Sequence, residues 1–216
     1  MLHHLWTYRV EADAGATVLP DGCRDVLVIS GPGRADEVRL TDWDLRPRSV
    51  RLTAGWTITG YRLRPGVTMD RQCIETLGGD PEQLEQAIAS EARADDEVGA
   101  MIEALVAPGA TVRSVARHAG VTARTLQRRF HALGLPGPDT WRLLGRARRA
   151  AWALAGPLPI ADIACASGYS DQAHMTREFV RWFGAPPDRL RRDGPLLRQI
   201  RQPGLGNWTG EQISTR

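Results

Sequence analysis

The sequence predicts an α+β protein in which a mixed β/α amino-terminal domain precedes an all-α domain with two helix-turn-helix units joined by a linker helix. Three observations support this class. Short apolar runs between turn residues occupy the first part of the chain, helical spacing of apolar residues begins at Asp80, and one residue pattern occurs twice in the second half. We divide the chain into residues 1–107, residues 108–193 and a carboxyl-terminal tail, 194–216.

Three segments near the amino end have the composition of strands. Asp25–Ser30 is a continuous apolar run after a Pro-Asp-Gly turn, which predicts a strand buried on both faces. Ser49–Thr53 alternates between polar and apolar residues, and Thr57–Leu63 is rich in β-branched residues before an Arg-Pro-Gly turn. Several short strands separated by turns predict a small sheet or a partial barrel.

The periodicity changes to that of helices after this region. Asp80 is placed to cap a helix, Pro81 occupies its first position, and Gln83 completes a capping signature. Apolar residues at helical spacing follow as far as Leu105. A Pro-Gly pair at 108–109 then indicates the linker between the two domains.

The segment Ser114–Phe130 has the pattern of two short helices around a glycine. Val112, Val115, Ala116 and Ala119 recur at i, i+3, i+4 and i+7, and Gly120 is the residue type that ends a helix in the left-handed region. Val121 then fills the turn and Thr122 caps the next helix, whose buried stripe is Leu126 and Phe130. The sequence therefore predicts a helix-turn-helix unit.

The same pattern returns further along the chain. Ile163, Ala164, Gly168 and Tyr169 stand 48 positions after Val115, Ala116, Gly120 and Val121. Met175, Arg177 and Phe179 stand 49 positions after Leu126, Arg128 and Phe130, so the second turn is longer by one residue. A spacing kept through two helices predicts a second helix-turn-helix unit.

These motifs resemble a known family. Residues Thr111 to Arg192 are similar to the DNA-binding domain of AraC/XylS-type transcription regulators, with A-x3-G-V-[ST]-x-R-x-L-x-R-x-F in the first unit and I-A-x3-G-[YF]-x-D-Q-x-H-x-T-R-x-F in the second. Met175 and Asp171 depart slightly from the usual residues. The resemblance implies a seven-helix domain whose two recognition helices enter successive major-groove segments on one face of DNA. LPDGCRDVLV and GYRLRPG resemble an uncharacterised domain that precedes such readers, which brings no known ligand.

The distribution of charge agrees with a nucleic-acid partner. Residues 1–107 hold 11 arginines and 18 acids, for a net charge of −7, whereas residues 108–216 hold 17 arginines and 7 acids, for a net charge of +10. A basic half next to an acidic half is typical of a nucleic-acid-binding domain joined to a domain with another role. Alone, this asymmetry is equally compatible with an ordinary solvated surface.

Long polar side chains on the second helix of each unit are the expected base contacts. The expected DNA-binding residues are Arg124, Gln127 and Arg128 in the first unit, and Gln172, Thr176 and Arg177 in the second. A linker helix over Pro138–Ala155 would span about 27 Å, against about 34 Å for one turn of DNA. Arg142, Arg146, Arg148 and Arg149 are expected to make its polar side basic, and Arg149 and Arg146 are expected to contact phosphates.

The sequence predicts a cytoplasmic, sequence-specific DNA-binding transcription regulator that is not an enzyme. The alternative is a DNA-modifying or repair enzyme that uses the same module for targeting. Cys23 is the candidate nucleophile for that alternative, but the histidines nearest to it in the sequence lie at positions 3 and 4, so a turn cysteine is the preferred interpretation. Trp43, Trp56 and Tyr61 fit either a ligand pocket or the core.

The expected partners follow from the two domains. They are double-stranded DNA and, beyond it, RNA polymerase, a small-molecule effector of the amino-terminal domain and a second copy of the chain. No metal, cofactor or membrane is expected, because the sequence has neither clustered ligands nor a long apolar run. The operator, the effector and the choice between activation and repression stay open.

Overall fold

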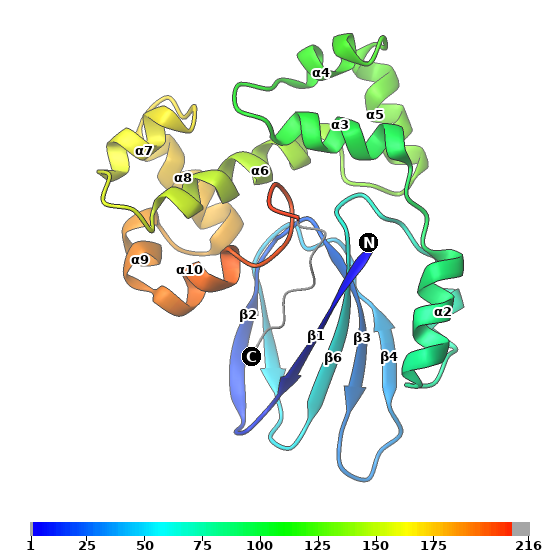
Figure 1. Cartoon of the computed structure of the whole chain (residues 1–216). Helices are drawn as coiled ribbons and strands as arrows, with labels where there is room; N and C mark the ends of the chain where they lie inside the picture. The colour runs from blue at the N-terminus through cyan, green and yellow to red at the C-terminus, as the bar shows by residue number, and fades with distance from the viewer. Residues whose placement is uncertain (1, 209–216) are drawn as a thin grey trace.

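The computed structural model describes residues 2–208 and has the predicted order of strands followed by helices (Figure 1). Six strands come first: β1 His3–Arg9, β2 Ala14–Val18, β3 Arg24–Ser30, β4 Glu37–Leu40, β5 Arg48–Leu52 and β6 Thr57–Leu63. Three helices follow: α1 Gln72–Glu75, α2 Pro81–Glu91 and α3 Asp96–Val106. The remaining helices are α4 Val112–His118, α5 Ala123–Ala132, α6 Pro138–Ala153, α7 Ile160–Ala166, α8 Gln172–Phe183, α9 Pro187–Arg192 and α10 Gly194–Ile200. None of the helices described is both long and apolar enough to cross a membrane.

The strands form two antiparallel sheets. Four strands pair in the order β1-β6-β3-β4, and β2 pairs with β5 in a separate ribbon. One face of the larger sheet packs against α1 and α2, where Val26, Val28 and Tyr61 meet Ile74 and Leu84. The predicted small sheet is therefore confirmed. The three strands predicted from the sequence are β3, β5 and β6, with ends that differ by at most one residue.

The prediction that Asp25–Ser30 is buried on both faces is wrong. Val26 and Val28 are buried under the helices, but Leu27 and Ile29, which alternate with them, are only half-buried. The reason is that successive side chains of a strand point to opposite faces, and within residues 2–208 no layer packs closely on the second face of this sheet. It lines a cleft instead.

The helices of the second half share one core with α3. Met101, Ile102 and Leu105 of α3 are buried in the same cluster as Trp141 and Leu144 of α6. A Cβ on Gly145 of α6 would lie 2.5 Å from a methyl of Val106, so the glycine allows α3 and α6 to approach closely. The boundary after residue 107 stays a prediction, but α3, which precedes it, packs with the helices that follow it.

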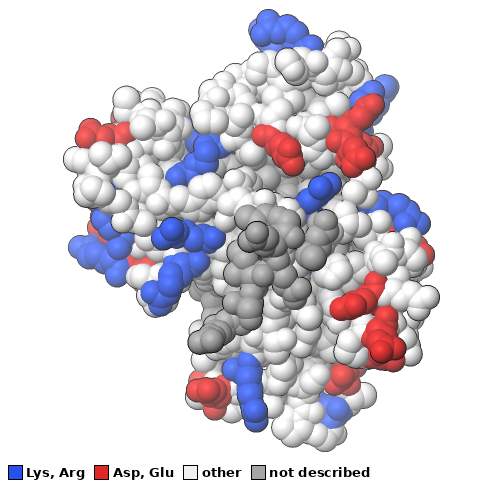
Figure 2. Space-filling model, viewed as in Figure 1, with Lys and Arg blue, Asp and Glu red and all other residues white. Residues whose placement is uncertain are grey.

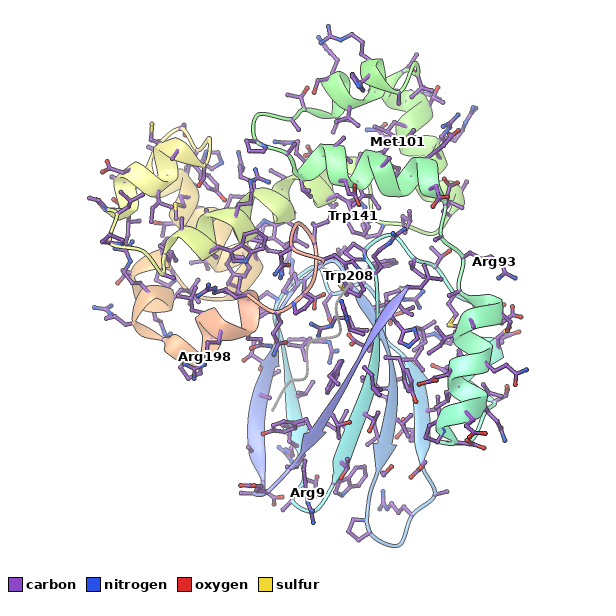
Figure 3. The ribbon with its side chains drawn as sticks, in the orientation of Figure 1. Arg9, Arg93, Met101, Trp141, Arg198 and Trp208 are labelled. Atoms are coloured by element: carbon purple, nitrogen blue, oxygen red, sulfur yellow. The ribbon has the colours of Figure 1, made fainter. Side chains whose placement is uncertain are left out.

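The segment after α9 packs against the rest of the protein. Residues 194–200 form α10, and residues 201–207, which we call the carboxyl-terminal strap, turn back to the amino-terminal domain. The Leu205 N–H donates to the Asp21 carbonyl at 2.8 Å, and the rings of Trp208 and His4 lie 4.2 Å apart. Figure 3 labels Trp208 where the strands meet the helical half. Residues 209–216 of the predicted tail lie outside the described part.

Candidate nucleic-acid interface

The first helix-turn-helix unit consists of α4 and α5. The Thr111 and Ser114 side chains form a capping box at the start of α4, and Gly120 ends it with a φ of 67°. The Val121 N–H donates to the Ala116 carbonyl at 2.9 Å, which closes the turn. The Thr122 side chain then caps α5 by accepting a hydrogen bond from the backbone of Thr125.

The second unit, α7 and α8, repeats this geometry. Gly168 ends α7 with a φ of 75°, and the Tyr169 N–H donates to the Ala164 carbonyl at 3.0 Å. Asp171 caps α8 by accepting from the His174 N–H at 2.6 Å, and this hydrogen bond lowers the pKa of its carboxyl. The first residues of α4 and α7 are 48 positions apart, and those of α5 and α8 are 49 positions apart. The predicted repeat of two units is confirmed.

The residues that bury the two recognition helices are also equivalent. Leu126 and Phe130 of α5 are fully buried, and so are Met175 and Phe179 of α8. Met175 therefore does the packing expected of its position despite its departure from the usual residue. With these stripes turned inward, the opposite face of each helix is available to a partner.

On α5 the structure leaves all three predicted DNA-binding residues exposed. Arg124, Gln127 and Arg128 lie on the outer face, and within residues 2–208 their side chains make no hydrogen bond or ion pair. The neighbouring Arg129 differs, because its guanidinium pairs with Glu97 of α3 at 2.8 Å. Three unengaged side chains with several donors on one helix face can contact base edges without breaking an internal contact.

On α8 the three predicted residues are not equally available. Gln172 and Arg177 are exposed, whereas Thr176 is half-buried and its hydroxyl donates to the Gln172 carbonyl at 2.9 Å. The Thr176 methyl and a lone pair of its oxygen remain for a partner. Gln172 and Arg177 therefore lie at the surface of α8, just as Gln127 and Arg128 lie at the surface of α5.

The linker helix α6 has 16 residues, a length of about 24 Å, and lies between the two units (Figure 1). Arg146 is half-buried on it: its guanidinium lies 4.3 Å from the centre of the Tyr169 ring, donates to the Gly168 carbonyl at 3.3 Å and approaches Glu178 at 3.9 Å. Arg149 is also half-buried, and burial lowers its pKa. One of its terminal nitrogens, which is buried, has no hydrogen-bond partner among the described residues.

Arg146 thus has an evident role inside the protein. It joins α6 to the turn of the second unit, so its predicted contact with phosphate would require it to serve two partners. Arg149 makes no hydrogen bond or ion pair within residues 2–208, although its buried terminal nitrogen would have to turn outward to reach a phosphate, and Arg146 also has one buried nitrogen without a partner there. Both phosphate contacts stay predictions, and the structure favours Arg149 over Arg146 as the residue able to make one.

Arg148 is the important residue of α6 that the sequence interpretation missed. We expected it on the basic polar side of the helix, and this is wrong, because only 1% of its surface is exposed. Its guanidinium donates to the Leu205 and Gln202 carbonyls at 3.0 and 2.9 Å and to the Asn207 side chain at 3.1 Å. A sequence signal existed: position 148 lies four after Leu144, on the buried stripe of α6.

Charge separates over the surface as well as along the chain. In Figure 2 basic side chains gather over α9 and α10, while acidic side chains gather near α2. Arg189, Arg192 and Arg198 are exposed on these carboxyl-terminal helices, and Glu82 and Glu85 are exposed on α2. Positive potential on the helical half attracts phosphate, and negative potential on the sheet domain repels it.

Comparison with known proteins matches this half of the chain. Residues 115–193 match a family described as "Helix-turn-helix domain". The HTH-type transcriptional regulator VirS of Mycobacterium tuberculosis, in strains CDC 1551 and H37Rv, is 36% identical over 113 residues, which are 50% of this chain and 32% of that protein. The chain thus spans about a third of the length of these relatives.

Two solved structures are also similar. A transcriptional regulator with an AraC-type DNA-binding domain from Chromobacterium violaceum is 27% identical to this chain. The aligned region includes 50% of this chain and 91% of that structure's chain, with a TM-score of 0.39. The carboxyl-terminal domain of AraT, a response regulator from Geobacillus stearothermophilus, is 26% identical. The aligned region includes 45% of this chain and 82% of that structure's chain, with a TM-score of 0.39.

Proposed function

We propose that this chain, whose residues 115–193 belong to the helix-turn-helix domains and resemble those of the AraC type, is a sequence-specific DNA-binding transcription regulator. The observation that carries the proposal is the equivalence of Arg128 on α5 and Arg177 on α8, which stand 49 positions apart and are both exposed. Each face also presents an exposed glutamine, Gln127 on α5 and Gln172 on α8, at positions that are not equivalent, and the side chains of these four residues make no hydrogen bond or ion pair among residues 2–208. Both residue types read base edges in the major groove.

The two units act together because α6 joins them. A helix of about 24 Å, with the turns at its ends, fits units that read major-groove segments about one helical turn of DNA apart. The expected site for one chain has two short blocks centred about 10 bp apart. Arg124, Gln127 and Arg128 would read one block, and Gln172, Thr176 and Arg177 the other.

Selection from a random DNA library with the purified full chain tests this proposal. We expect enriched sequences with two blocks at this spacing and a binding constant that falls steeply with salt, because neutralised phosphates release counterions. Enrichment of a single block would restrict base reading to one unit. Absence of any enriched sequence would contradict sequence-specific binding.

The sheet domain is proposed as the regulatory part. Its acidic surface repels phosphates, and its sheets border a cleft of about 1170 Å³, so an effector or a second copy of the chain suits it better than DNA. As a cytoplasmic regulator of transcription, the protein would also contact RNA polymerase. Thermal shift with a metabolite library and sedimentation for mass test the effector and the homodimer separately.

The competing enzymatic function has an observation against it. Cys23, its candidate nucleophile, is buried, and burial raises the pKa of its thiol well above the usual value. The thiolate, and not the protonated thiol, is the nucleophile. The backbone N–H of Cys23 donates to the Asp21 carboxylate at 2.8 Å in a tight turn. This environment supports a structural role for Cys23, so we propose no catalytic activity for the chain.

A further inference from the structure

The cleft in the sheet domain lies between the two sheets and has a volume of about 1170 Å³. Alternate residues of the larger sheet face it, so that Tyr8, Ile58 and Ile29 stand side by side across β1, β6 and β3. Val50 and Leu52 of β5 line it from the smaller ribbon. These apolar side chains are half-buried or exposed although they belong to a sheet face, because no layer of the described residues packs on them.

Trp6 forms a flat platform in this cleft. Its ring lies directly over Gly60, where a Cβ would be 2.2 Å from the indole, so only glycine at this position lets the ring lie against the sheet. The indole N–H donates to the Asp25 carboxylate at 2.9 Å, which fixes the orientation of the ring. One ring face thus covers the backbone, and because Trp6 is half-buried and lines the cleft, a planar ligand there could stack on the other face.

The charged groups of the cleft wall neutralise one another. Arg62 pairs with Asp25 at 3.3 Å, Arg48 with Asp44 at 2.6 Å, and two further ion pairs join Arg39 to Glu37 and Arg71 to Asp42. These eight residues contribute no net charge to the wall. Arg51 and Asp193 also line the cleft and add one charge of each sign: Arg51 alternates with Val50 and Leu52, so its side chain points to the other face of β5, and the Asp193 carboxylate accepts a hydrogen bond from the Leu196 N–H at 3.0 Å. An ionic ligand would therefore lose its hydration without gaining an unmatched counter-charge.

The far wall of the cleft comes from the other end of the chain. Leu196 and Gln199 of α10 line it, and the Gln199 side chain donates to the Thr17 carbonyl of β2 at 2.8 Å. Pro203 of the carboxyl-terminal strap also lines it and accepts a hydrogen bond from Arg62. The same strap is bound on its other side by Arg148 of α6. A ligand in the cleft would therefore contact the carboxyl-terminal strap, which is hydrogen-bonded to the linker helix α6.

We propose that this cleft binds a small, uncharged, planar apolar molecule that stacks on Trp6 and contacts α10. Its effect on DNA rests on the proposed function of the helical half, but binding itself does not. The volume is sufficient for a ligand of drug size. The aromatic floor, the aliphatic walls and the paired charges select an apolar molecule without net charge.

Two fluorescent probes with one skeleton test the chemistry. N-phenyl-1-naphthylamine is neutral, and 1-anilinonaphthalene-8-sulfonate differs from it by one sulfonate. We expect the full chain to bind one equivalent of the neutral probe, with energy transfer from tryptophan because Trp6 and Trp56 line the cleft. The anionic probe should bind at least about tenfold more weakly. Equal or tighter binding of the anionic probe would overturn the proposal.

Neighbouring residues of β6 provide a matched pair of variants. Ile58 faces the cleft, whereas Thr59 does not line it and lies beside Val28 of β3, whose side chain is buried on the opposite face of the sheet. Ile58→Asn should weaken binding of the neutral probe by about tenfold, whereas Thr59→Asn should leave it unchanged. Circular dichroism confirms the fold of both. Equal effects of the two changes would place the probe elsewhere.

A chain shortened to residue 208 tests whether the protein fills its own cleft. If the full chain excludes the neutral probe and the shortened chain binds it, the occupant is the segment 209–216 and the proposal is overturned. Equal binding by both chains supports a separate ligand. The consequence for DNA is measured last: the probe should change operator affinity of the wild type and not of Ile58→Asn. Probe binding without operator binding would contradict the function of the helical half and leave the ligand site intact.

Discussion

The Arg148 guanidinium donates to the Leu205 carbonyl at 3.0 Å, which ties the linker helix between the two helix-turn-helix units to the carboxyl-terminal strap. Leu205 in turn donates its N–H to the Asp21 carbonyl of the sheet domain at 2.8 Å. On the sheet side, Asp25 and Asp21 raise the pKa of Arg62 against the opposing effect of its burial, and Arg62 donates to the Pro203 carbonyl at 3.3 Å. The strap is therefore held from both domains.

Arg148→Ala should destabilise the protein. The change leaves a cavity, deprives the buried Leu205 carbonyl of its side-chain donor and leaves the Gln202 carbonyl with only the Asn207 side chain as donor, for an expected loss of about 2–4 kcal/mol in the free energy of unfolding. Arg201→Ala, on the exposed surface of the same strap, should cost less than about 0.5 kcal/mol. Chemical denaturation measures both. Similar small losses would mean that Arg148 does not hold the strap.

Arg128→Ala and Arg177→Ala should each relax base preference in a different block of the operator. Each change should cost about 1–3 kcal/mol of binding if the guanidinium contacts a guanine through two hydrogen bonds. Selected-site sequencing with both variants makes the comparison. If Arg177→Ala leaves both blocks unchanged, the second unit is a packing or phosphate-binding element and the first is the reader.

Arg149→Ala should weaken binding to all DNA sequences alike. A lost phosphate contact reduces the slope of log binding constant against log salt by about one unit and leaves the selected sequence unchanged. Arg146→Ala serves as the comparison: it removes the guanidinium from Tyr169 and Glu178, so it should also lower thermal stability. A changed operator sequence with Arg149→Ala would place this residue on a base.

Tyr169 should make stability depend on alkaline pH. Burial raises the pKa of its hydroxyl to about 12, from 10.0 in the unfolded chain, so the folded state favours the neutral phenol. This stabilisation is complete below pH 10 and is lost as the pH rises towards about 12. Urea denaturation at both ends of this range should show a smaller loss for Tyr169→Phe than for the wild type. Tyr8→Phe changes an exposed ring and is the control; the same loss in all three proteins would exclude Tyr169 as a cause.

Gly60→Ala should displace the Trp6 ring. A Cβ 2.2 Å from the indole forces the ring or the strand to move, at an expected cost of about 1–3 kcal/mol, and it should change tryptophan fluorescence. Gly15→Ala in β2 is the matched change, because nothing lies within 4 Å of its added Cβ. It should be neutral or slightly stabilising. A harmless Gly60→Ala would show that Trp6 does not lie on the sheet.

The sequence by itself determined the helix-turn-helix units. Thr122 caps a helix, Gly120 and Gly168 end helices, and the buried stripes repeat at a constant spacing. Each of these features depends on residues within one or two turns of one another, so local pattern is sufficient to predict it. The surface position of Arg128 and Arg177 followed from the same periodicity.

Only the tertiary structure decided how the two halves meet. Burial of Arg148 depends on carbonyls more than 50 positions away, and the cleft depends on the pairing of β1 with β6 and on the return of α10 to β2. The continuous apolar run in Asp25–Ser30 does not reveal whether a second layer covers the strand. Such contacts join segments that are distant in the chain, and hydrophobic periodicity carries information only about neighbours within one element.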